Sequence, residues 1–197
     1  MAPAANLMSD HHLTEQTHSE TTVYQGSFLH VERHEVVLPS GQVTAREFIK
    51  HPGAVMIVPL LANGDVVIER QFRYPHQKIF IEFPAGKIDQ HESDLSCAQR
   101  ELKEETGFDA SEWVHLGTIH NAIAYSDERI EIFLAQGLMP GQHRLDEEEF
   151  LEVSQVPFAQ LIQWIEQGNV TDVKTIVGAY WVERYLRGEF KPVQTYR

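Results

Sequence analysis

Short runs of alternating polar and apolar residues characterise the first quarter of the chain. The runs lie at 23–24, 28–31, 35–38 and 43–49. A turn sequence, Pro39-Ser40-Gly41, separates the last two runs. A period of two is typical of strands with one buried face, so the segment 21–50 predicts a small antiparallel β unit. Residues 1–20 have few apolar side chains and no periodicity, and they predict a mobile tail.

More apolar segments follow and predict a main domain over 51–197. The segments 54–61 and 65–71 flank Asn63-Gly64, a dipeptide favoured in tight hairpin turns, and predict a pair of adjacent strands. Further strands are predicted at 79–83, 113–122 and 128–135. Strands arranged around two or three helices predict an α/β sandwich.

Apolar residues at helical spacing predict three helices, at 94–106, 157–167 and 172–187. A glycine follows each of them, at positions 107, 168 and 188, where it suits the end of a helix. The residues predicted to face inward are Leu95, Ala98 and Leu102 in the first helix, Phe158, Leu161, Ile162 and Ile165 in the second, and Ile176, Tyr180 and Trp181 in the third.

The first predicted helix carries a dense set of acidic residues. The chain reads Gly86-x5-Glu92-x7-Arg100-Glu101-Leu102-x-Glu104-Glu105-x-Gly107-Phe108. Glu101, Glu104 and Glu105 project from one side of the helix, where like charges need compensation by cations. Arg100 can serve Glu104 one turn on, and Glu92 if the loop folds back. The other carboxylates are well placed for Mg²⁺, which prefers oxygen ligands. A solvated acidic face is the alternative, but such a face does not require two glycines and an arginine in register.

Composition narrows the classes of partner. The chain has 197 residues, which fits one domain with a modest appendage. Sixteen basic residues against 29 acidic ones give a net charge of −13, which argues against nucleic acid and anionic membranes as partners. The single Cys97 excludes an internal disulfide, suits a reducing cytoplasm, and is interpreted as a packed hydrophobic residue. No apolar run approaches transmembrane length, and no secretory signal is expected.

The acidic motif resembles the signature of the Nudix hydrolases, G-x5-E-x7-R-E-U-x-E-E-x-G-U, in which U is a bulky apolar residue. Every specified position is filled in this chain. The resemblance implies an α/β/α sandwich with a mixed sheet, and hydrolysis of a nucleoside diphosphate linked to another group. It implies that Mg²⁺, with Mn²⁺ as a substitute, is bound by Glu101 and Glu105, with Glu104 near or in the ligand shell. The backbone carbonyl of Ala85 is a further implied ligand. The structural positions of the motif are Gly86, Glu92, Arg100 and Gly107.

Outside the motif the chain is similar to the ADP-ribose pyrophosphatase branch of that family. The similar stretches are 46–55, 70–73, 82–86, 125–128 and 171–175. In that branch the N-terminal β unit exchanges between subunits, which implies a homodimer through this unit. The resemblance implies that Phe28, Arg46 and Glu47 bind substrate near the base, that Arg73 lies at the diphosphate and that Glu82 lies near the ribose or the metal.

Each of these assignments has a simpler alternative. Phe28 alternates correctly for a core aromatic residue, which burial statistics favour. Arg46 and Glu47 could form an ordinary pair on the surface of a strand. Arg73 is the best supported, because a planar guanidinium matches phosphate oxygens bidentately. For the general base the resemblance favours Glu149, with Glu148 next, although this acidic run could equally be a solvated loop.

One departure from the branch concerns the substrate. ADP-ribose hydrolases usually carry a proline about sixteen residues after the motif, whereas this chain has Ala122-Ile123-Ala124-Tyr125 there. A tyrosine near this position is instead a feature of dinucleoside polyphosphate hydrolases. ADP-ribose is therefore the first choice, other nucleoside diphosphate sugars the second and dinucleoside polyphosphates the third. A non-catalytic ligand sensor and a structural interaction protein are the alternatives from other classes, and the intact glutamates argue against both.

Overall fold

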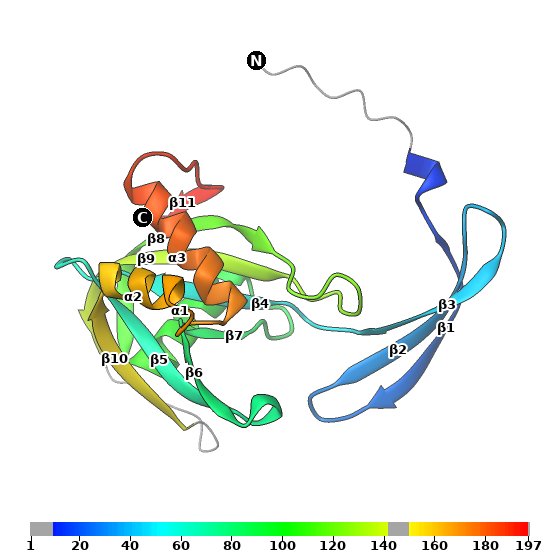
Figure 1. Ribbon diagram of the computed structural model, residues 1–197, viewed down its shortest axis with the longest axis horizontal. Helices are drawn as coiled ribbons and strands as arrows, with labels where there is room; N and C mark the ends of the chain where they lie inside the picture. The colour runs from blue at the N-terminus through cyan, green and yellow to red at the C-terminus, as the bar shows by residue number, and fades with distance from the viewer. Residues whose placement is uncertain (1–9, 142–149, 197) are drawn as a thin grey trace, which may run out of the picture. The chain divides into compact units, whose positions relative to one another are not determined.

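The computed structural model describes residues 10–141 and 150–196, which form two units (Figure 1). The first unit comprises the chain up to His51 together with Ala122–Asp127, and the second comprises Pro52–Asn121 and the chain from Glu128 onward. No helix within the described part of the chain is long and apolar enough to cross a membrane.

The N-terminal unit is a three-stranded antiparallel sheet in the order β1-β2-β3. Its elements are a short 3-10 helix (Asp10–His12), β1 (Gln16–Gln25), β2 (His30–Val37) and β3 (Val43–Ile49). The prediction of an antiparallel β unit is confirmed, but the prediction of a tail up to residue 20 is wrong from Gln16 onward. All ten residues of β1 are exposed, so this strand has no buried face that would give an alternating pattern. Residues 1–9 lie outside the described part of the chain.

The segment Ala122–Asp127 joins the N-terminal unit at the end of β3. The amide of Ile49 donates to the carbonyl of Tyr125 at 2.8 Å, and the amide of Asp127 donates back to the carbonyl of Ile49 at 3.2 Å. The amide of His51 donates to Oδ1 of Asp127 at 2.7 Å. Two segments far apart in the sequence are thereby held together within one unit.

The second unit contains a five-stranded mixed sheet in the order β11-β8-β9-β4-β7. Its strands are β4 (Ala54–Pro59), β7 (Ala85–Lys87), β8 (Phe108–Ile119), β9 (Ile130–Pro140) and β11 (Gln194–Tyr196). The pair β4–β9 is parallel and the other pairs are antiparallel. A three-stranded antiparallel sheet has the order β10-β5-β6. It comprises β5 (Asp65–Arg73), β6 (Lys78–Glu82) and β10 (Leu151–Pro157), and a short 3-10 helix, Tyr74–His76, connects β5 to β6.

Helices cover both faces of the five-stranded sheet (Figure 1). The helices are α1 (Asp94–Thr106), α2 (Phe158–Glu166) and α3 (Val173–Leu186). Along β4, Val55 and Ile57 pack in the core with α1, whereas Met56 and Val58 pack in the core with α2 and α3. Every residue of β4 is buried, as expected for a strand with covered faces. The predicted α/β/α sandwich with a mixed sheet is confirmed.

The turn predicted at Asn63-Gly64 forms, but the adjacent strand pair predicted on either side of it does not. The amide of Leu61 donates to the carbonyl of Asp65 at 2.8 Å, and Gly64 has a positive φ of 87°. Beyond the turn, the pairing between these two strands in the described structure is a single bridge from Leu60 to Val66. Both strands are apolar on both faces near the turn, and they enter different sheets, β4 as an interior strand of the five-stranded sheet and β5 as the central strand of the three-stranded sheet.

The helix predictions hold for α1 and partly fail for α3. Helix α1 has the predicted bounds, with Ser93 as its N-cap and Gly107 at φ +74° as its C-cap. In α3, Tyr180 is 37% exposed, so its predicted inward position is wrong. The buried face consists of Thr175, Gly178, Ala179 and Val182. These residues are small enough for close packing, since a Cβ on Gly178 would lie 2.3 Å from Cε of Met56.

Candidate active site

The acidic face of α1 packs against β7, and Glu101 makes the closest approach. A Cβ atom added to Gly86 would lie 1.9 Å from Cδ of Glu101, well inside van der Waals contact. The glycine of the motif is therefore required by the space that the Glu101 carboxylate occupies. The backbone of β7 and the carboxylate lie together because position 86 has no side chain.

Glu105 reaches the same strand one turn further along α1. Its residue is 5% exposed, and its Oε2 accepts a hydrogen bond from the amide of Ala85 at 3.0 Å. The structure thus brings Glu101, Glu105 and the Ala85-Gly86 backbone together. The two carboxylates offer oxygen ligands, which suit a hard divalent cation.

The carboxylates do not form a complete metal cage by themselves. Within residues 10–141 and 150–196, no three His, Cys, Asp or Glu side chains are arranged to hold a metal ion. Mg²⁺ usually retains several waters and binds through one or two carboxylates plus substrate phosphates. Glu101 and Glu105 therefore fit a partly open Mg²⁺ site better than a closed structural one.

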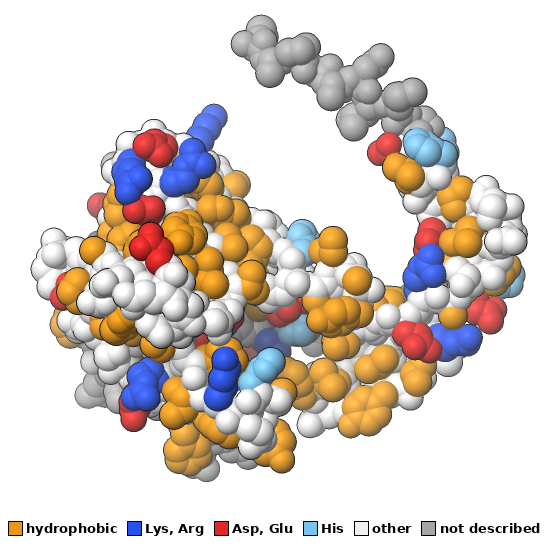
Figure 2. Space-filling view, viewed as in Figure 1, with side chains coloured by type: hydrophobic (Ala, Val, Ile, Leu, Met, Phe, Trp, Pro, Cys, Tyr) orange, Lys and Arg blue, Asp and Glu red, His pale blue; other side chains and the backbone are white. Residues whose placement is uncertain are grey.

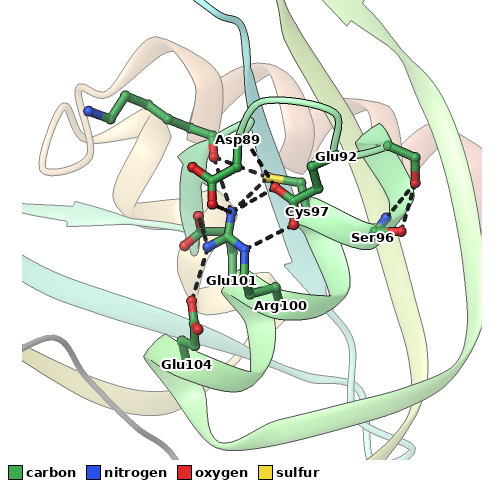
Figure 3. A network of polar contacts seen from close by, with 9 residues as sticks. Asp89, Glu92, Ser96, Cys97, Arg100, Glu101 and Glu104 are labelled. Atoms are coloured by element: carbon green, nitrogen blue, oxygen red, sulfur yellow. Dashed lines mark hydrogen bonds and ion pairs between the residues drawn. The ribbon is translucent and has the colours of Figure 1, made fainter.

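Arg100 is the centre of a polar network that links α1 to the preceding loop (Figure 3). Its Nε and Nη2 each donate to one carboxylate oxygen of Glu92 at 2.9 Å. Its Nη1 lies 2.7 Å from Oε1 of Glu101 and 3.0 Å from Oε2 of Glu104. Nη2 also donates to the carbonyl of Lys87 at 3.2 Å. One guanidinium thereby contacts three glutamates of the motif and the end of β7.

The pKa values within this network follow from its geometry. The hydrogen bond from Arg100 lowers the pKa of Glu92 to about 2, and the same bond raises the pKa of Arg100 above its ordinary value. Burial raises the pKa of the Cys97 thiol, whose Sγ lies near the carbonyl of Lys87. Glu92 and Arg100 therefore stay ionised at neutral pH, and Cys97 stays a protonated thiol.

A second charged cluster surrounds Glu82 at the end of β6. Glu82 is 3% exposed and accepts hydrogen bonds from Nε and Nη2 of Arg73 at 2.7 and 2.9 Å. Lys174 in α3 forms a further ion pair with Glu82 and lies 3.0 Å from Oδ2 of Asp172. Burial alone would raise the pKa of Glu82, but the hydrogen bond from Arg73 and the charge of Lys174 hold it below the ordinary value.

The two clusters are connected through a short stretch of backbone and through their charges. The hydrogen bond to Glu82 raises the pKa of Arg73, and the negative charge of Glu105 adds to this shift. The backbone between the clusters is anchored at both ends. The amide of Phe83 donates to Oγ1 of Thr175 at 2.9 Å, and the amide of Ala85 donates to Glu105. A cation beside a cluster of carboxylates can bind an anionic substrate that also carries a metal ion.

Three predicted substrate residues lie on the N-terminal unit. Phe28 is 69% exposed in the turn between β1 and β2, so the expectation of a core residue is wrong. Arg46 and Glu47 do not pair with each other, because successive residues of a strand point to opposite faces. Nε of Arg46 binds Oε2 of Glu15 at 3.0 Å, and Glu47 lies 3.7 Å from Arg33. The predicted base, Glu149, and its alternative at position 148 lie outside the described residues.

Several polar residues in this part of the molecule had no predicted role. Lys174 and Thr175 belong to a stretch that the sequence singled out without assigning them a function. Glu69 is 3% exposed and pairs directly with Glu82 across β5 and β6. Alternate residues of a strand share a face, so Glu69 and Arg73 lie on the same face of β5. This alternation, directly after an apolar run, is the sequence feature that could have identified Glu69.

A further buried acid, Glu131, lies on β9 on the α1 side of the sheet. It accepts hydrogen bonds from His115 at 2.8 Å (through Nε2) and from Thr118 at 2.7 Å. Arg129 binds Glu131 and also Oδ1 of Asp94, at 2.9 Å. Because Asp94 is the first residue of α1, this cluster ties the start of the helix to the sheet.

The α/β/α sandwich and the acidic helix on a glycine-containing strand define a Nudix-type domain. Residues 50–176 match the NUDIX domain, and residues 15–49 match the nucleoside diphosphate sugar hydrolase N-terminal domain. The chain therefore belongs to the Nudix family.

The similarity to known relatives and to a solved structure extends over most of the chain. The chain is 32% identical over 173 residues to the ADP-ribose pyrophosphatase of Bacillus subtilis (strain 168), covering 87% of this chain and 94% of that protein. It is 30% identical over 171 residues to the methanol dehydrogenase activator of Bacillus methanolicus, covering 86% and 92%. A crystal structure of an ADP compounds hydrolase superposes with a TM-score of 0.80 at 26% identity, covering 89% of this chain and 95% of that one.

Replacing Gly86 with alanine is predicted to impair catalysis strongly. The new Cβ would lie 1.9 Å from Cδ of Glu101, so either the carboxylate or β7 must move. Displacement of a catalytic group by about 1 Å can lower the rate on the order of a hundredfold. Steady-state kinetics of Gly86→Ala should show this loss in kcat, with an unchanged circular dichroism spectrum. Gly64→Ala is the control: its positive φ of 87° makes a side chain costly to stability, but a Cβ there meets nothing within 4 Å, so kcat should be kept; an equal kcat in both variants would contradict the prediction.

Replacing Glu92 with glutamine is predicted to destabilise the fold at neutral pH. The pKa of Glu92 falls from 4.5 to about 2 on folding, so its contribution is present above about pH 4.5 and is lost as the pH falls towards 2. The free energy of unfolding is expected to fall by roughly 2 kcal/mol at pH 7. This figure is smaller than the pKa shift alone would give, because solvent partly screens the pair. Urea unfolding of wild type and Glu92→Gln at pH 7 and pH 3 measures it, and the difference should shrink at the lower pH.

The matched control is Glu152→Gln, which removes a carboxylate from an exposed pair. Glu152 lies 2.6 Å from Arg70, and both side chains are exposed. Surface pairs of this kind contribute about 0–1 kcal/mol. A similar loss in both variants, or a pH-independent loss in Glu92→Gln, would contradict the assigned role of the Arg100 network.

Proposed function

We propose that this Nudix enzyme hydrolyses the diphosphate linkage of ADP-ribose to AMP and ribose 5-phosphate, with Mg²⁺ as its cofactor. The observation that carries the proposal is the convergence of Glu101 and Glu105 on the Ala85-Gly86 backbone, in one electrostatic site with Arg73. The name of the B. subtilis relative supports the choice of ADP-ribose.

In the proposed mechanism, Glu101, Glu105 and the carbonyl of Ala85 would hold Mg²⁺, or Mn²⁺ in its place, with Glu104 beside them. The metal, when bound, neutralises the diphosphate and lowers the pKa of a water molecule. Arg73 binds phosphate oxygens with its planar guanidinium and orients the diphosphate. Arg100 holds α1 against the loop, so the acidic side chains keep their positions as the substrate binds.

A glutamate of the acidic run at 146–149 is proposed as the general base. Glu149 is the first choice and Glu148 the second, on the resemblance found in the sequence. The base accepts the proton of the attacking water while the new oxygen–phosphorus bond forms and the anhydride bond to the leaving phosphate breaks. The two products carry the two phosphoryl groups of the original diphosphate.

Other substrates remain second and third choices. The N-terminal unit matches a domain named for nucleoside diphosphate sugar hydrolases, which favours other nucleoside diphosphate sugars as the second choice. Dinucleoside polyphosphates come third, because of the tyrosine at position 125.

Phe28, Arg46 and Glu47 are proposed to bind the base, and Glu82 is proposed to lie near the ribose or the metal. The cytoplasmic location stays a prediction from the single cysteine.

The test is product formation from ADP-ribose, ADP-glucose, GDP-mannose, diadenosine polyphosphates and NADH, with Mg²⁺ and with a chelator. Release of AMP and ribose 5-phosphate from ADP-ribose is expected only with the metal. Glu105→Gln should lower kcat by more than about a hundredfold, because a metal ligand contributes several kcal/mol to the transition state. If the enzyme prefers another compound, the proposed substrate is wrong, but the proposed hydrolysis of a diphosphate linkage stands.

The same assay, with further variants and a binding measurement beside it, addresses the remaining proposals. Glu149→Gln should lower kcat by more than about tenfold, and a smaller loss, together with a small loss in Glu148→Gln, would remove the loop base from the mechanism. Binding of ADP-ribose by wild type without turnover of any compound would favour the non-catalytic sensor. Metal-dependent turnover would dismiss both the sensor and a purely structural protein.

A homodimer through the N-terminal unit is the proposed assembly. Among the described residues of this unit, only Glu32 and Val36 are buried, which is too few for an independent core. Apolar side chains instead lie on its surface near the turn between β1 and β2, including Val23, Tyr24 and Phe28 (Figure 2). A second copy that covers this surface would supply the missing core.

Light scattering at micromolar concentration is expected to show twice the chain mass of 22.6 kDa. Val23→Asp should shift the protein towards the monomer, because it introduces a charge into the proposed interface. Val193→Asp is the control, since this valine is similarly exposed but lies on the other unit. A wild-type species of 22.6 kDa would overturn the proposed dimer.

A further inference from the structure

The buried carboxylate of Glu82 has two cationic partners on different elements. Arg73 at the end of β5 makes a bidentate pair with it, at 2.7 and 2.9 Å. Lys174 in the first turn of α3 contacts its Oε2 from another side of the cluster. A buried carboxylate that loses its cationic partner strongly destabilises its surroundings. Because Glu82 has two cationic partners, one of them can leave while the other still compensates the buried charge.

The two cations differ in their exposure to solvent. The side chain of Arg73 is 42% exposed, whereas that of Lys174 is 13% exposed. Lys174 is also held by Oδ2 of Asp172 at 3.0 Å, and Asp172 is fixed as the N-cap of α3 through its bond from the amide of Thr175. An incoming anion can therefore meet Arg73 while Lys174 stays enclosed between two carboxylates.

The position of Lys174 is not explained by α3 itself. The N-terminal turn of a helix carries a partial positive charge, which disfavours a cation there. The two carboxylates that Lys174 contacts offset this effect, and one of them belongs to a strand 92 residues away in sequence. The lysine is thus located by Glu82 and Asp172 and not by the requirements of the helix.

We propose that Lys174 is a positioning residue that keeps Arg73 available to the substrate. When Arg73 turns from Glu82 to the phosphate oxygens, Lys174 remains as the counter-ion of Glu82. Without Lys174, the departure of Arg73 would leave a buried charge uncompensated, so Arg73 would stay bound to Glu82. This inference rests on the proposed placement of Arg73 at the diphosphate, and it adds a residue that does not itself touch the substrate.

The experiment is a double-mutant cycle in the full-length protein with Lys174→Met, Glu82→Gln and the combination of both. Calorimetry measures the Kd of methylenediphosphonate, a diphosphate that cannot be hydrolysed, in the presence of Mg²⁺. Lys174→Met should weaken binding about tenfold or more, because Arg73 is retained by Glu82. In the Glu82→Gln background the same change should have little effect, because a neutral amide does not retain Arg73.

Two further variants separate this role from a structural one. Lys174→Arg keeps the charge and should restore wild-type affinity, and Lys191→Met removes an exposed lysine elsewhere and should change nothing. Thermal unfolding of each variant checks the fold, and Lys174→Gln replaces the methionine variant if that variant does not fold. Equal weakening by Lys174→Met in both backgrounds, no weakening in either, or absence of probe binding by wild type would overturn the inference.

Steady-state kinetics with ADP-ribose on the same proteins separates this inference from the proposed function. Lys174→Met is expected to raise KM about tenfold while kcat changes by less than about threefold, since the residue acts on binding. If the cycle gives the predicted Kd values but the wild type does not hydrolyse ADP-ribose, the proposed substrate is wrong and the proposed role of Lys174 stands. If ADP-ribose is hydrolysed normally but the Kd is the same for every protein of the cycle, the proposed substrate stands and the proposed role of Lys174 is wrong.

Discussion

The acidic face of α1 depends on the guanidinium of Arg100. Three carboxylates on one side of a helix repel one another, and Arg100 compensates two of them through a single nitrogen that lies within 3.0 Å of both Glu101 and Glu104. Its other two nitrogens bind Glu92 and fix the loop before the helix. Because the pKa of Glu92 is lowered to about 2, this anchor stays charged well into the acidic range. The motif arginine and the first motif glutamate thus make it possible to concentrate negative charge for metal binding.

A stretch of five residues, 82–86, connects the acidic helix to Arg73, the cation proposed to bind phosphate. At one end Glu82 holds Arg73, and at the other Gly86 provides the space for Glu101. Between them, the amide of Phe83 binds α3 and the amide of Ala85 binds α1. Buried amides of this kind are costly to leave unsatisfied, so both helices are held at fixed positions on the stretch. The distance between the carboxylates and Arg73 is therefore set by short-range backbone contacts.

Local signals allowed α1 to be predicted with its bounds, because the apolar face of Leu95, Ala98 and Leu102 and the terminal Gly107 lie close together in the sequence. The motif identified Glu101, Glu105 and Gly86 for a similar reason. Features that depend on distant neighbours were not predictable. The turn at Gly64 indicates a chain reversal, but it does not reveal that β4 pairs with β9 and β7 or that β5 pairs with β10 and β6. Strand β1 is polar and exposed along its whole length, and the pairing of Lys174 with Glu82 joins residues that no local pattern relates.

The departure from the branch at 122–125 falls on a segment with its own structural role. This segment bonds to the end of β3, the strand that carries Arg46 and Glu47, and it forms part of the N-terminal unit. The acidic helix, Arg73 and Lys174 all belong to the other unit. A change at 122–125 therefore alters the N-terminal unit directly, whereas the bonds described for the α1 carboxylates come from Arg100 and Ala85 of the other unit. The groups proposed to act on the diphosphate all belong to the second unit, so the N-terminal unit can vary within the branch while the motif stays intact.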